Sequence, residues 1–149
     1  MTNYLIFALP LAIGFAGVVQ GGLNQEIMKN WGITGAVLIN NLQVLFWSLL
    51  IWYLARHATG LFPEEWRPLE QPNRIYWWYI IPGLSGFLIV AGIPIAIEKV
   101  GAGKTFMAIL LAQLIGGVAW DFFVDGKAIE WRQFAGLIAA TIGAVLMFK

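Results

Sequence analysis

Two apolar stretches of the sequence carry carboxamide side chains at spacings that place them on one helical face. Within residues 33–55, Asn40, Gln43 and Trp47 are separated by three and then four positions, with Asn41 beside them, and such spacing lines up on a helix. A carboxamide donates and accepts hydrogen bonds, and in hydrocarbon without a partner it costs on the order of several kcal/mol by transfer scales. This face therefore meets either a wet, solute-binding cavity or another polar helix.

The second stretch, AQLIGGVAWDFF at residues 112–123, repeats the combination. Gln113, Gly116, Gly117 and Trp120 share one helical face, and few polar groups on an apolar wall are typical of a solute pocket. Close packing around the glycines, with Gln113 bonded to Asn40 or Asn41, is the alternative. We predict a substrate pocket, and its walls are expected to be Asn40, Gln43, Trp47, Gln113, Gly117 and Trp120.

One acid and two prolines lie in or next to apolar stretches. Asp121 is a candidate for ion coupling, because an intramembrane acid is by default a functional-site hypothesis. It lies near the end of its stretch, so a pair with Lys127 or Arg132 explains it as well. Pro10 and Pro94 are expected to bend their helices, and bent helices often flank a transporter's substrate site. A static kink that only improves packing fits the same prolines.

A third motif, GAGKT at residues 101–105, suggests a nucleotide-binding loop but fails its pattern. That loop requires a glycine five residues before the GK pair, and Glu98 occupies this position. The glycines instead predict a tight turn between two apolar helices.

The composition identifies the elements that must position these residues. The chain has 149 residues, of which 60% are hydrophobic and 11% charged, whereas soluble domains carry about 25% charged residues. Its apolar runs are long enough to cross a hydrocarbon core about 30 Å thick, where each must be a helix that satisfies its own backbone. We predict an all-α, polytopic membrane protein, a single domain over residues 1–149, with five spans at 4–23, 33–55, 75–97, 105–124 and 134–148.

Several classes of function are disfavoured by what the sequence lacks. There is no cysteine for a disulfide or a thiolate site, and a net charge of +1 gives no basic field for nucleic acid. The one histidine, His57, lies in a predicted loop without a nucleophile. We expect no enzyme activity, no metal and no cofactor.

The basic residues barely favour one orientation in the membrane. With five spans, the side of the N-terminus holds Arg56, Arg67, Arg74, Lys127 and Arg132, and the other side holds Lys29, Lys99, Lys104 and Lys149. Such a small excess is a weak orientation signal. Insertion in both orientations would give an antiparallel pair with the inverted symmetry common in secondary transporters, although so small a count is also compatible with one fixed orientation.

Stretches along nearly the whole chain carry a family resemblance. GGLNQEIMKNWG, GAVLINNLQVLFW, IPGLSGFLIVAGIPIAIEKVGAG, AQLIGGVAWDFF and GLIAATIGAVLM resemble the drug/metabolite transporter superfamily, in particular its short five-helix YdcZ-type bacterial branch. The resemblance implies a half-sized transporter of the bacterial inner membrane that forms ten helices as a homodimer or with a sister chain. It would move a small metabolite or drug-like solute by alternating access.

The first predicted span departs from the smallest members of that superfamily. Those proteins exchange protons through an acid in their first helix, whereas residues 4–23 contain none. Two other functions remain compatible with the sequence, namely a passive channel built from the same dimer and an accessory membrane protein that transports nothing.

Overall fold

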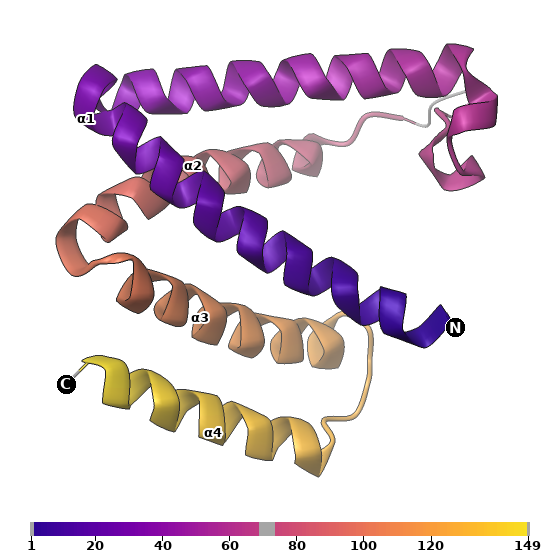
Figure 1. Cartoon of the computed structure of the whole chain (residues 1–149). Helices are drawn as coiled ribbons and strands as arrows, with labels where there is room; N and C mark the ends of the chain where they lie inside the picture. Colours follow the sequence, from indigo (N-terminus) through magenta and orange to yellow (C-terminus); the bar gives the residue numbers. More distant parts are fainter. Residues whose placement is uncertain (1, 69–73, 149) are drawn as a thin grey trace. The chain divides into compact units, whose positions relative to one another are not determined.

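The computed structural model describes residues 2–68 and 74–148, and every regular element within these ranges is helical (Figure 1). Four α-helices carry most of the chain: α1 (Thr2–His57), α2 (Ile80–Val100), α3 (Ala102–Phe123) and α4 (Trp131–Phe148). Between α1 and α2 lie the short 3-10 helices η1 (Thr59–Leu61), η2 (Glu64–Trp66) and η3 (Trp77–Tyr79).

All four α-helices are long and apolar enough to cross a membrane, which confirms the predicted all-helical membrane fold. Five spans were expected where the described residues form four such helices, because α1 covers both of the first two predicted spans. The aromatic residues Trp77, Trp78 and Tyr79 form η3 immediately before α2, in the region where interfacial aromatic belts occur.

A single glycine interrupts α1. Gly32 has φ 70° and ψ 169°, a backbone region that is essentially restricted to glycine, and α1 changes direction sharply along its length (Figure 1). Gly35, one turn beyond Trp31, has no room for a side chain, because a Cβ atom there would lie 2.8 Å from the Trp31 Cβ. Gly32 is therefore required for its backbone dihedral angles. Gly35 is required because a side chain there would collide with Trp31.

The polar stretch before the bend, expected to be a connection between spans, is helical up to Gly32. Glu26 pairs with Lys29 one turn later at 2.8 Å, and the Asn30 side chain donates to the Glu26 carbonyl at 3.0 Å. Pairs at this spacing stabilise a helix surface, so polar residues continue the helix here. The stretch between the first two predicted spans is therefore itself helical, since polarity alone does not end a helix.

The turn predicted at GAGKT is confirmed. α2 ends at Val100, Gly101 adopts φ 85° and ψ 158°, and α3 begins at Ala102. The Gly101 carbonyl accepts hydrogen bonds from the Thr105 backbone amide at 3.1 Å and from the Thr105 hydroxyl at 2.8 Å. A helix precedes the motif where a nucleotide-binding loop needs a strand.

The chain divides into two compact units, one formed by residues 1–22 and 95–149 and the other by residues 23–94. In the first unit, α3 and α4 lie side by side (Figure 1). The start of α3 meets the end of α4: the Lys104 ammonium lies 5.9 Å from the centre of the Phe148 ring, and Met147 lies next to Gly103. These two helices therefore pack in opposite directions.

Candidate functional site

The bend in α1 brings two asparagines into a buried pair. The Asn24 Nδ2 atom donates to the Asn40 Oδ1 atom at 3.1 Å, and the residues are only 5% and 9% exposed. Asn40 Nδ2 in turn donates to Asn41 Oδ1 at 3.4 Å. A buried amide must find partners of this kind, so Asn40 helps to hold residues 23–31 of α1 against the helical segment that follows Gly32.

Asn41, the neighbour of Asn40, lines an apolar groove of about 470 Å³ between α1 and α2. Successive residues of a helix point about 100° apart, which explains why Asn40 is buried in the pair while Asn41 lines the groove. The groove is lined by Ile33, Thr34, Val37, Leu38 and Asn41 from α1 and by Phe87 and Ala91 from α2.

The other two residues of the predicted α1 face lie outside this groove. Gln43 and Trp47 are exposed, and the Trp47 ring meets the Phe46 ring edge to face with centroids 5.3 Å apart. The predicted face is thus divided, since its first member is buried and the next two lie on the surface. A role for Asn40, Gln43 and Trp47 in binding a solute stays a prediction.

The second predicted face lies on α3 and points away from α4. A groove of about 520 Å³ separates the two helices, and its lining is apolar: Ala108, Leu111, Ala112, Ile115, Ala144, Val145 and Phe148. Gln113, Gly117 and Trp120 are all exposed and lie about 140° around α3 from the residues that face α4, at about 100° per residue. Their membership of a substrate pocket is likewise still a prediction.

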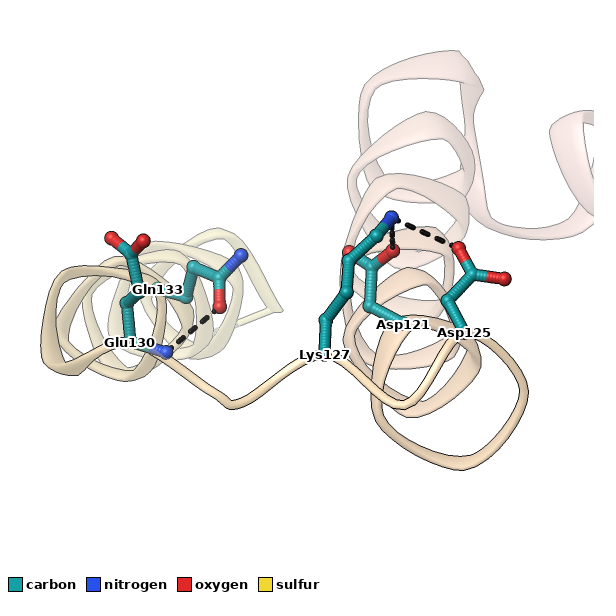
Figure 2. Close-up of polar contacts among 5 residues, drawn as sticks. All are labelled: Asp121, Asp125, Lys127, Glu130 and Gln133. Carbon is teal, nitrogen blue, oxygen red and sulfur yellow. Dashed lines mark hydrogen bonds and ion pairs between the residues drawn. The ribbon is translucent and has the colours of Figure 1, made fainter.

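Asp121 pairs with a lysine beyond the end of α3 (Figure 2). The Lys127 Nζ atom lies 2.8 Å from Asp121 Oδ1 and 2.9 Å from Asp125 Oδ2. The hydrogen bond with Asp121, followed by that with Asp125, raises the pKa of Lys127 above its ordinary range. The local pair with Lys127, predicted as the alternative to ion coupling, is confirmed, and a coupling role for Asp121 stays a prediction.

The start of α4 is fixed by a side chain in the same region. Gln133 accepts a hydrogen bond from the Glu130 backbone amide at 3.0 Å through its Oε1 atom (Figure 2). A glutamine that reaches back to the residue before a helix in this way satisfies one of the free amides of the helix start. This contact explains why α4 begins at Trp131, three residues before the predicted span.

Both predicted kink prolines lie inside helices, but in different surroundings. Pro94 in α2 is fully buried, whereas Pro10 in α1 is exposed. The non-helical dihedral angles of α1 lie at Gly32 and not at Pro10. A bend at either proline stays a prediction, and the interruption of α1 comes from glycine.

The predicted substrate pocket did not include Asn24, Asn41, Phe87 or Ala91. One signal for Asn24 was available, because Asn24 and Asn40 lie equally far from Gly32 along the chain. Phe87 and Ala91 are apolar residues within an apolar stretch, so nothing in the sequence marks them as site residues. They line the groove only because this part of α2 lies beside α1.

The four apolar helices are long enough to cross a membrane. They carry a buried pair of asparagines at the bend of α1 and an exposed glutamine on α3. Together these features define a polytopic helical membrane protein. The chain belongs to the family described as "Putative inner membrane exporter, YdcZ", which matches residues 5–146. It is therefore a transport protein of the bacterial inner membrane, as the resemblance predicted.

Two curated proteins are similar to the chain. The "Inner membrane protein YdcZ" of Escherichia coli (strain K12) is 32% identical over 156 residues, which cover 100% of this chain and 98% of that protein. A UPF0060 membrane protein of Gluconacetobacter diazotrophicus is 24% identical over 72 residues, 48% of this chain and 63% of its own length. No solved structure matches.

Proposed function

We propose that the chain is one half of a secondary transporter that exports a small metabolite or drug-like solute by alternating access. Each chain would cross the membrane five times, and two antiparallel copies would supply ten helices. The bend at Gly32 supports this count, because the helical arm on each side of it has the length of a membrane span.

The position of Gln113 on the side of α3 opposite to α4 is the observation that carries the proposal. Gln113, Gly117 and Trp120 point away from α4 and are exposed. Facing lipid, the Gln113 amide would lack hydrogen-bond partners at a cost of several kcal/mol on transfer scales. A water-filled path between two copies removes that cost and gives a solute both an amide and an aromatic wall.

Pairing of antiparallel copies is supported by the nearly balanced basic residues on the two sides of the membrane. The test fuses to the C-terminus a reporter that works only in the cytoplasm or one that works only in the periplasm. The proposal expects activity from both fusions. Activity from one fusion alone would rule out the antiparallel homodimer, and co-purification of a second, related chain would then identify the sister partner.

Transport itself is tested with solutes that raise the thermal unfolding temperature of the purified protein. In liposomes, a transporter should move such a solute with saturation and with counterflow of labelled solute against unlabelled solute. Flux that neither saturates nor shows counterflow would identify a passive channel. No flux of any stabilising solute would favour an accessory protein.

A further inference from the structure

The groove between α1 and α2 combines an apolar lining with one amide whose donor is free. Asn41 Oδ1 accepts from Asn40 Nδ2, and among the residues that the structure describes, Asn41 Nδ2 has no protein acceptor. The groove has a volume of about 470 Å³, within the range of sites that hold drug-sized ligands. Asn41 is exposed in the single chain, and a donor that faces hydrocarbon is costly unless a ligand or water accepts its hydrogen bond.

The free donor is the end of a directed chain of hydrogen bonds. Asn24 Nδ2 donates to Asn40 Oδ1, and Asn40 Nδ2 donates to Asn41 Oδ1. Hydrogen bonds in series polarise one another, which strengthens the last donor. The last hydrogen bond turns the Asn41 oxygen toward Asn40, and Asn41 itself lines the groove.

The rest of the lining selects for an apolar ligand. Ile33, Val37 and Leu38 supply aliphatic surface from α1, and Phe87 supplies an aromatic ring from α2. The lining contains no charged residue, so an ion would enter without a counter-charge. A ligand that complements this groove has a flat apolar body and a single neutral acceptor.

We propose that this groove binds a small aromatic solute that has a carbonyl or ether oxygen, which accepts a hydrogen bond from Asn41 Nδ2. The inference rests on the proposed function, because it names the class of substrate that the transporter would carry. It also assigns separate roles to adjacent amides, with Asn40 as the positioning residue and Asn41 as the group that contacts the solute.

The probe for this site is 6-propionyl-2-(dimethylamino)naphthalene, an aromatic ketone whose fluorescence responds to hydrogen bonding at its carbonyl. Binding is titrated to the purified full chain in lipid nanodiscs, with empty nanodiscs as the reference. Asn41→Leu removes the donor at similar volume, and Ala91→Phe fills the groove. The matched controls are Thr141→Val, which removes an exposed polar group of α4, and Ala12→Phe, which enlarges an exposed alanine of α1.

The proposal expects saturable binding to wild type and to both controls. Asn41→Leu should weaken binding about 2- to 10-fold, the equivalent of one neutral hydrogen bond, and should shift the bound dye's emission to shorter wavelength. Ala91→Phe should abolish saturable binding. Equal binding by wild type and Ala91→Phe would overturn the proposal, since lipid or a neighbouring chain would then occupy the groove.

Failure of this inference can be told from failure of the proposed function. If solutes are transported but Asn41→Leu binds the dye as wild type does, the groove assignment is wrong and the transporter stands. If the dye binds as expected but no solute crosses the liposome membrane, the groove is a binding site and the transporter is wrong. Circular dichroism of each variant checks that its helices are retained.

Discussion

The Asn24 Nδ2 and Asn40 Oδ1 atoms lie 3.1 Å apart although their residues are separated by 16 positions, and Gly32 lies midway between them. The hydrogen bond and the bend therefore depend on one another: the bend brings the two amides together, and the buried pair links the helical segments 23–31 and 33–57. The same pair orients Asn40, which positions Asn41 in the groove.

Replacing Gly32 by alanine tests the bend. The change should lower the free energy of unfolding by about 1–3 kcal/mol, because a residue with a Cβ is strained at φ 70° and ψ 169°. Thermal or denaturant unfolding in detergent measures it. Gly22→Ala is the matched control, since Gly22 is helical with nothing within 4 Å of an added Cβ, and it should be neutral or stabilising by up to about 1 kcal/mol. Equal losses in the two variants would contradict the account.

The Asn24–Asn40 pair is tested by a double-mutant cycle. Asn24→Leu and Asn40→Leu should each destabilise the protein by about 1–3 kcal/mol, because each removes the hydrogen bond between the two buried amides. The double variant should lose less than the sum, with a coupling of about 0.5–1.5 kcal/mol. Strictly additive losses would mean that the two amides do not stabilise each other.

The interaction of Lys127 with Asp121 and Asp125 predicts how stability varies with pH. Because the folded state raises the pKa of Lys127, its contribution is fully present below the unfolded pKa of about 10.4 and is lost as pH rises through the folded value. The difference in unfolding temperature between wild type and Lys127→Met should therefore be the same at pH 7 and pH 9. A difference that disappears by pH 9 would show that Lys127 titrates too low for this ion-paired arrangement.

The orientation of the chain should respond to small changes in charge. Lys99→Gln with Lys104→Gln removes two charges from one side, so the five basic residues of the other side should stay in the cytoplasm and the C-terminus should be periplasmic. The matched pair Arg67→Gln with Arg132→Gln should give the opposite bias. The one-sided C-terminal reporters measure both. If the two double variants kept the same distribution as wild type, charge would not set the topology.

Much of the helical fold could be predicted from the sequence, because a helix must satisfy its own backbone in lipid. The ends of the first two predicted spans could not, since the Glu26–Lys29 pair continues the helix through a polar segment and a single glycine makes the bend. The turn at Gly101 was predictable because an isolated glycine-rich segment separates two apolar runs.

The candidate site was less predictable. Helical spacing grouped Asn40 with Gln43 and Trp47, but spacing within one helix does not say what each position meets. Asn40 meets Asn24 only because the chain bends at Gly32, and Asn41 gains a groove only because Phe87 and Ala91 lie beside it. The local pair of Asp121 with Lys127 was predictable, since both residues lie within the same short segment.

The central claim is that the Gln113 face of α3 looks onto water inside the assembled protein. The chain has no cysteine, so Gln113→Cys and Ile115→Cys each introduce a single thiol, the second on the side of α3 that faces α4. A membrane-impermeant maleimide reacts with the hydrated thiolate. The account predicts rapid labelling of Gln113→Cys in proteoliposomes and little labelling of Ile115→Cys. If both thiols were equally unreactive while the protein remained folded, the face would be dry and the transporter proposal would be contradicted.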